Sequence, residues 1–134
     1  MSETKKEIYS ALSQLIQVAK SDGNLHDEEV KFIHVIGIQM GLNDKEMLGL
    51  IKDPAPYKPF ESELDRIVQF QRICLLMHVD GGSSATEIKT IKNIGLRLGL
   101  NPRATGEVIK AMDSSENKLI PPEELLKIYL KYNN

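Results

Sequence analysis

The sequence has little of several things, and each shortage excludes a class of protein. A single cysteine, Cys74, cannot form an internal disulfide and is typical of a protein in a reducing, cytoplasmic environment. No run of about 18 apolar residues could span a membrane, and the first residues contain no apolar core of a signal peptide. Neither sign of charge dominates, because 17 basic residues stand against 19 acidic ones, so we expect no nucleic-acid binding.

What is present is enough for a folded domain. The 134 residues are 41% hydrophobic and 27% charged, a balance typical of one globular domain and not of a disordered chain. Apolar residues recur at helical spacing, and no segment alternates apolar and polar residues as a half-buried strand does. The sequence therefore predicts an all-α fold, a helical bundle of about seven helices within one domain, residues 1–134.

The chain repeats itself internally. Shifted by 58 residues, it aligns with itself without gaps, and ten of the 22 positions from 22 to 43 are identical. The similarity extends over residues 5–52 and 63–112, which predicts two copies of a three-helix unit. Three prolines between the copies favour an extended connector over residues 53–60. A further C-terminal helix, residues 122–132, has no counterpart in the first copy.

Glycines mark the ends of the first two helices. Gly23 is expected to end a helix over about residues 3–21, because glycine readily adopts the left-handed conformation. The second helix is expected to begin near Asp27 and to end at Gly41. The apolar side chains that should point inward from this second helix are Val30, Ile33, Ile36 and Met40.

Capping residues mark the start of the third helix in both copies. Asn43 is predicted to cap it in the first copy, with Glu46 three residues later as its reciprocal partner. At the matched position of the second copy, Asn101 precedes Pro102, which suits the first helical position because it lacks an N–H. Two different sequences thus predict the same helix start.

Two further glycines lie inside helices at matched repeat positions. Gly37 and Gly95 each cost about 1 kcal/mol of helix propensity relative to alanine, so a packing reason is expected. Apolar residues flank both of them on the buried stripe, where a missing side chain lets another backbone approach. We expect the first and second helices of each copy, or the two copies, to cross tightly there.

An acidic motif is shared by the two copies. An Asp-Gly pair is followed after five residues by a glutamate, which gives Asp22 with Glu29 and Asp80 with Glu87. Carboxylate oxygens are the ligands that Ca²⁺ and Mg²⁺ prefer, and a tight turn can bring residues seven apart together. The motif therefore predicts a metal site at these four residues, with a divalent cation as the candidate cofactor.

A second interpretation of the motif needs no ligand. A calcium EF-hand is excluded, because its first and third loop positions would be Val18 and Lys20. In a capping box, Glu87 would serve the helix that Ser84 begins, and Glu29 would take the equivalent place behind His26. Each such cap stabilises a helix by about 1 kcal/mol, and capping and cation binding are compatible.

No motif for catalysis is present. His26, His34 and His78 lack zinc-ligand spacing, and the sequence contains neither a nucleophile elbow nor a phosphate-binding loop. Cys74 lies in the most apolar predicted helix and is expected in the core. We therefore expect a non-enzymatic protein. The alternative is a metal-dependent enzyme that uses the clustered carboxylates, which would require the two acidic corners to converge.

Both copies contain short stretches that carry a family resemblance. These are Ala19-Lys20-Ser21-Asp22-Gly23, Glu28-Glu29 and Gly41-Leu42, then Val79-Asp80-Gly81, Glu87 and Leu98-Gly99-Leu100. They resemble the TerB-like family, which takes its name from a tellurite-resistance protein, and the resemblance covers residues 10–110. It implies an all-helical module related to those of stress-response proteins and J-domain co-chaperones, with acidic residues that bind divalent cations. Transferred to this chain, these are the four carboxylates named above.

Sequence and resemblance together lead to one expected function. The chain is expected to be a cytoplasmic, stress-related interaction domain that binds a partner protein, with divalent-cation binding at its acidic helix corners.

Overall fold

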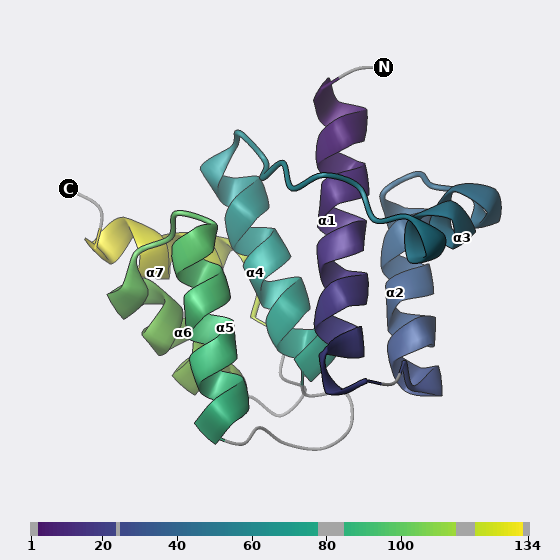
Figure 1. Ribbon diagram of the computed structural model, residues 1–134. Coiled ribbons are helices and arrows are strands. Elements are labelled where there is room, and N and C mark those ends of the chain that lie inside the picture. The colour runs from purple at the N-terminus through teal and green to yellow at the C-terminus, as the bar shows by residue number, and fades with distance from the viewer. Residues whose placement is uncertain (1–2, 24, 78–84, 115–119, 133–134) are drawn as a thin grey trace. The chain divides into compact units, whose positions relative to one another are not determined.

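The computed structural model is all-helical in the residues that it describes, which are 3–23, 25–77, 85–114 and 120–132 (Figure 1). The all-α prediction is confirmed for these residues, which contain no strand. None of the helices within these ranges has the length and apolarity that a membrane crossing requires. The α-helices are α1 (Glu3–Ala19), α2 (Asp27–Gln39), α3 (Asp44–Lys52), α4 (Glu63–Met77), α5 (Ala85–Arg97), α6 (Pro102–Ser114) and α7 (Pro122–Tyr132).

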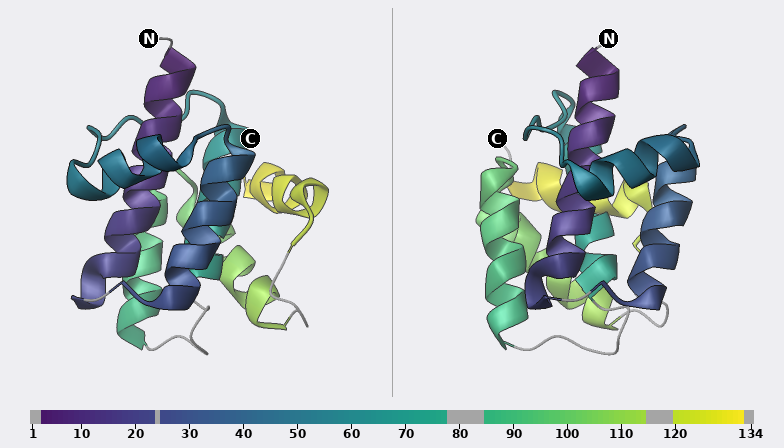
Figure 2. Two further views of the ribbon diagram at one scale, coloured as in Figure 1. Left: turned by 90° about the vertical axis from the view of Figure 1, so that its right-hand side faces the viewer. Right: turned by 45° about the vertical axis from the view of Figure 1, so that its right-hand side comes forward.

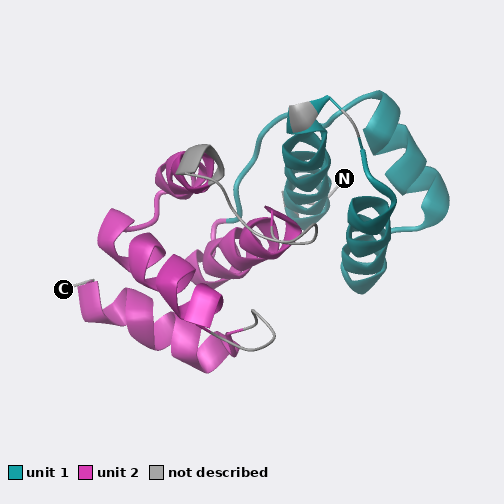
Figure 3. Ribbon diagram, turned by 90° about the horizontal axis from the view of Figure 1, so that it is seen from below, with its two compact units in different colours: residues 1–60 teal, residues 61–134 magenta. Residues whose placement is uncertain are grey.

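The chain divides into two compact units, Met1–Phe60 and Glu61–Asn134 (Figure 3). Unit 1 contains α1 to α3 and unit 2 contains α4 to α7. The division falls at the end of the predicted connector, residues 53–60. The single domain predicted from chain length stays a prediction, and each unit is described by itself.

In unit 1, α1 packs against both α2 and α3. Figure 2 shows α1 and α2 running side by side, with α3 crosswise to them. The helices form because apolar residues recur every three or four positions and so gather on one face. The buried side chains of this unit include Leu12, Leu15 and Ile16 of α1, Ile33 and Ile36 of α2, and Met47 and Leu50 of α3.

The connector returns along α1 in extended form. The Ala55 N–H donates to Ser13 Oγ at 3.0 Å, and the Lys58 N–H donates to Ser10 Oγ at 2.7 Å. Both serines are buried, so these bonds satisfy polar groups that would otherwise cost free energy. The prolines of this segment cannot donate, and two N–H groups between them hold the segment in place.

In unit 2, α4 packs against α5 and α7, and α6 packs against the same two helices. The C-terminal helix is confirmed with the predicted bounds, Pro122–Tyr132. It buries Leu125 and Tyr129. Ahead of it, the Ile120 N–H donates to the buried Gln71 Oε1 at 2.8 Å.

Helix boundaries follow the register of the sequence repeat. Helices α2 and α5 begin and end 58 residues apart, and α3 and α6 begin 58 residues apart. Gly41 and Gly99 both have left-handed φ values, of 89° and 79°. The following N–H groups, of Leu42 and Leu100, donate to the carbonyls of Gly37 and Gly95 at 2.9 and 3.0 Å. These matches support a duplication of three-helix units, which stays a prediction.

The predicted caps of the third helices are confirmed. Asn43 Oδ1 accepts from the Glu46 N–H at 2.8 Å, and Glu46 Oε1 accepts from the Asn43 N–H at 3.0 Å. In the second copy, Asn101 Oδ1 accepts from the Arg103 N–H at 2.9 Å, ahead of a helix that begins at Pro102.

Two expectations need correction. The first helix ends at Ala19 rather than near residue 21, and Lys20–Asp22 form a 3₁₀ turn that Gly23 ends with a φ of 94°. Val30 is not in the core, because it is 41% exposed. It lines a groove between α2 and α3 and stays in contact with solvent.

Gly37 and Gly95 are buried as predicted, but at Gly37 the neighbouring helix differs from the expected one. A Cβ at Gly37 would collide with the Met47 side chain of α3, so the close approach joins the second and third helices. A Cβ at Gly95 would lie 2.9 Å from Thr105 Cγ2 of α6 and 3.2 Å from Phe70 Cε1 of α4. The expected approach of the first helix therefore occurs at Gly95, alongside that of the third.

Candidate functional site

The acidic motif is a helix cap where the structure describes it. Glu29 is buried at the third position of α2, and its Oε1 accepts from the His26 N–H at 3.0 Å. This confirms the capping interpretation for Glu29. Asp80 and the side chains of Asp22 and Glu87 lie outside the described residues, so the metal site stays a prediction. Within the described ranges, no three His, Cys, Asp or Glu side chains gather as a metal site would require.

The cysteine is confirmed as a core residue. Cys74 is buried in α4, and burial raises the pKa of its thiol to about 12. A thiol in that environment stays protonated at neutral pH and is a poor nucleophile.

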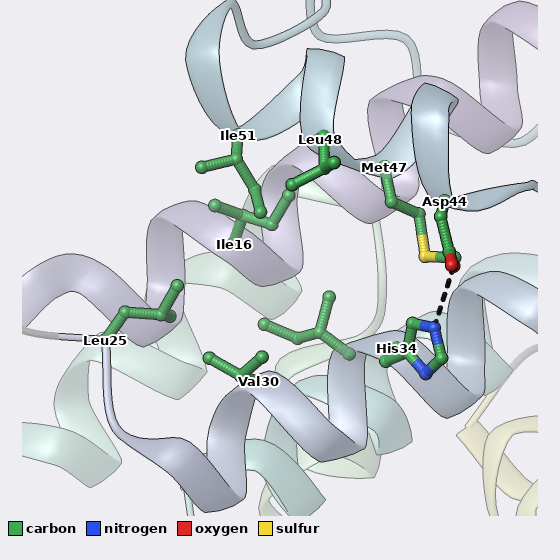
Figure 4. A pocket seen from close by; sticks show the side chains of 9 residues that line it. Ile16, Leu25, Val30, His34, Asp44, Met47, Leu48 and Ile51 are labelled. Carbon is green, nitrogen blue, oxygen red and sulfur yellow. Dashed lines mark hydrogen bonds and ion pairs between the residues drawn. The ribbon is translucent and has the colours of Figure 1, made fainter.

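Unit 1 contains an apolar groove of about 280 Å³. Figure 4 shows α3 side chains on one side of it and α2 side chains on the other, with Ile16 of α1 between them. Seven of its lining residues are apolar, and polar groups occur at one end only. The lining residues are Ile16, Leu25, Val30, Ile33, His34, Asp44, Met47, Leu48 and Ile51.

The Met47 side chain of α3 lies against Gly37, in the C-terminal half of α2. This contact is near the polar end of the groove, where Met47 is a lining residue beside His34 and Asp44 (Figure 4). Further along α2, toward Val30, the side chains of the two helices do not fill the space between them, and this space is the groove (Figure 4).

Large apolar side chains at the groove remain in contact with solvent. Val30 is 41% exposed and Leu48 is 60% exposed. Covering apolar surface is favourable by about 25 cal/mol per Å². An exposed apolar surface that is also concave is typical of a binding site rather than of ordinary surface.

At the polar end of the groove, one side chain from each of its two walls takes part in a hydrogen bond. His34 Nε2 of α2 lies 2.9 Å from Asp44 Oδ1 of α3, with side chains 49% and 80% exposed. Asp44 is the first residue of α3, where the helix dipole stabilises a negative charge. Of the nine described residues that line the groove, none is a serine, threonine, cysteine or lysine. The arrangement offers a surface for apolar groups, with one carboxylate and one imidazole at its end.

Sequence reasoning did not find this groove. It considered His34 as a zinc ligand, whereas the structure places this half-exposed side chain beside Asp44. A signal was available in α3, where Met47, Leu48, Leu50 and Ile51 are too many apolar residues for one buried stripe of a nine-residue helix.

Comparison of the chain with models of known protein families, with curated proteins and with solved structures finds no match. The TerB-like resemblance therefore rests on the motifs of the sequence and stays a prediction.

Proposed function

We propose that this chain is a non-enzymatic interaction module whose unit 1 groove binds an amphipathic helix of a partner protein. The observation that supports the proposal is the apolar groove of about 280 Å³ with Val30 and Leu48 exposed at it. A helix that enters such a groove presents apolar side chains three and four residues apart, which lie on one face. The resemblance to TerB-like modules supports a stress-related role for the interaction.

The shape of the groove favours a helix over an extended peptide. An extended peptide usually binds by adding a strand to a sheet edge, and the described residues of unit 1 contain no strand. The walls of the groove are two helices, between which the ridge of a third helix can pack.

The test is a titration of the full chain with a designed helical peptide, followed by amide NMR shifts. The peptide has about 18 residues, with leucines at i, i+3, i+4 and i+7 and polar, uncharged residues elsewhere. We expect shifts in residues 25–51, and Leu48→Glu should abolish them. Leu96→Glu is the matched control, because Leu96 is 54% exposed on α5, outside the groove. Shifts elsewhere, or shifts that Leu48→Glu leaves unchanged, would contradict the proposal.

We also propose that Asp22, Glu29, Asp80 and Glu87 bind a divalent cation. The repeated motif and the resemblance support this proposal. Addition of Mg²⁺, Mn²⁺ or Ca²⁺ should raise the melting temperature, since a ligand that binds only the folded state stabilises it by RT ln(1 + [L]/Kd). Glu87→Gln should remove that rise while keeping most of the cap. No cation-dependent rise in the unmodified chain would rule out both this site and the alternative of a metal-dependent enzyme.

A further inference from the structure

We infer that the groove selects a helix with a lysine or arginine at one end of its apolar face, and that this cation pairs with Asp44. The inference rests on the proposed function and specifies the chemistry of the partner. It starts from the position of Asp44, which is the acidic residue among those lining the groove.

The Asp44 carboxylate is open to a new partner. Its side chain is 80% exposed, and the contact that engages it among the described residues is the pair with His34. An ion pair between exposed side chains contributes little, about 0–1 kcal/mol. A cation from a bound helix can therefore take the place of His34 at small cost, and an arginine can bind both carboxylate oxygens at once.

Unit 2 provides a precedent for this chemistry within the same chain. Helix α7 is amphipathic, and it packs on α4 and α6 through buried Leu125 and Tyr129. Near its end, Lys131 Nζ donates to both carboxylate oxygens of Glu107 on α6, at 2.9 and 3.2 Å. A lysine near the end of an apolar helix face thus pairs with a carboxylate on the third helix of the unit.

Unit 1 has the corresponding elements without the added helix. Asp44 is a carboxylate on α3, the third helix, and it lies at one end of an apolar groove. The location differs, because α7 lies on α4 and α6 whereas the groove is lined by α1, α2 and α3. What the two sites share is an apolar surface that ends at a carboxylate.

Neighbouring charges limit where the cation of the partner can lie. Lys45 and Lys52 precede and follow Leu48 by three and four residues, so they lie on the same side of α3. They would repel a helix that is basic along its whole length. A single cation at the Asp44 end, with neutral or acidic residues beside Leu48, satisfies both conditions.

The experiment compares variants of the designed peptide that differ at one residue. One variant carries arginine before the first leucine and one carries it after the last, because the direction of the bound helix is open. Glutamine replaces arginine in the neutral peptide and glutamate replaces it in the acidic one. Their Kd values are measured against the full chain by NMR titration or calorimetry. We expect one arginine peptide to bind about three- to tenfold tighter than the neutral peptide, and the matching glutamate peptide to bind more weakly.

Two variants of the chain assign the effect to its residue. Asp44→Asn should remove the preference for arginine, while Asp65→Asn, the same change of charge at an exposed position of α4, should keep it. Equal binding of the arginine and neutral peptides, or a preference that survives Asp44→Asn, overturns the cation pairing and leaves helix binding intact. Failure of every peptide to bind overturns the proposed function as well. A dimer in analytical ultracentrifugation that Leu48→Glu abolishes would make a second copy the occupant and overturn the partner helix.

Discussion

Each unit contains a glutamate that accepts hydrogen bonds from a tyrosine and a lysine, but the helices that these side chains join differ between the units. In unit 1, Glu46 of α3 accepts from Tyr9 Oη and from Lys5 Nζ, which fixes α3 to α1. In unit 2, Glu107 of α6 accepts from Tyr132 Oη and from Lys131 Nζ, which fixes α6 to α7. In both, the lysine lies over the tyrosine ring, at 5.6 and 5.5 Å from its centroid.

The two glutamates do not occupy matched positions of the repeat. Glu46 corresponds to Ala104 in the second copy, and Glu107 corresponds to Gly49 in the first. In unit 1 the third helix is tied to the first, and the α2 side of α3 remains as a groove wall. In unit 2 the third helix, α6, is joined by these bonds to the fourth helix, α7. The two units therefore use the same three side-chain types at different places, and only in unit 1 does the third helix also line the apolar groove described above.

The largest loss of stability should come from substitutions at the two buried helical glycines. The side chains that contact these glycines are flexible in unit 1 and stiffer in unit 2. Gly37→Leu and Gly95→Leu should each destabilise the chain by about 2 kcal/mol or more through overpacking. Alanine should separate the two sites. At Gly95 the new Cβ meets a β-branched Thr105 and the Phe70 ring, whereas at Gly37 it meets the flexible Met47 side chain.

We therefore expect Gly95→Ala to lower the melting temperature clearly and Gly37→Ala to lower it less. Thermal unfolding by circular dichroism measures both. Gly49→Ala is the control, because a Cβ there meets nothing within 4 Å. Equal losses at the two buried sites would show that side-chain flexibility does not set the cost.

Most of the fold could be predicted because its signals are local. The bounds of α7, the start of α6 after Asn101 and the turn at Gly41 all follow from caps and glycines close to them in sequence. Glu29 as a cap was predictable for the same reason, since its donor is only three residues away.

The apolar residues of α3 indicate an exposed apolar surface, but the groove itself could not be located from the sequence, because it depends on a distance between helices. His34 and Asp44 lie on different helices, so their contact depends on how α2 and α3 pack, as does the contact of Met47 with Gly37. Periodicity identifies which face of α2 is apolar. It does not say which residues of that face a neighbouring helix covers, and Val30 is 41% exposed.

A smaller loss of stability is expected from substitutions on the first helix of each unit that remove a hydrogen bond to the chain segment following the third helix. Ser13 and Gln71 occupy matched repeat positions, and each accepts a backbone N–H from the segment that follows the third helix. The Gln71 bond is buried, so Gln71→Met should cost about 1–3 kcal/mol by leaving the Ile120 N–H unsatisfied.

Ser13→Ala should cost less, about 1 kcal/mol, because the Ala55 N–H is only partly buried and can reach water. Urea unfolding of the two variants gives both free energies. Gln17→Met, at an exposed position of α1, controls for the change from amide to thioether. If Ser13→Ala lowered the free energy of unfolding more than Gln71→Met, burial would not determine how much each of these two hydrogen bonds contributes.

The smallest effect concerns acid stability and distinguishes the two glutamates. Hydrogen bonds from Tyr9, the Asn43 N–H and Lys5 lower the pKa of Glu46 from 4.5 to about 2. Glu107 has Tyr132 and Lys131 as donors, which lower its pKa as well. A carboxyl whose pKa is depressed by folding stabilises the folded state above its unfolded pKa, and this contribution is lost as the pH falls through the folded value.

Glu46→Gln should therefore lower the melting temperature most near neutral pH, and the difference from the unmodified chain should shrink between about pH 4.5 and pH 2. Glu107→Gln should also lower the melting temperature near neutral pH, but by less, because the Glu107 carboxylate has fewer hydrogen-bond donors than that of Glu46. Both changes in melting temperature should be small, because solvent screens both groups. Melting curves of both variants from pH 7 to pH 2 measure this. Tyr9→Phe should reproduce part of the Glu46→Gln loss, since the tyrosine hydroxyl is the largest cause of that pKa shift. A Glu107→Gln loss that exceeds the Glu46→Gln loss would reverse the ranking, and would mean that fixing α7 contributes more to unit 2 than fixing α3 to α1 contributes to unit 1.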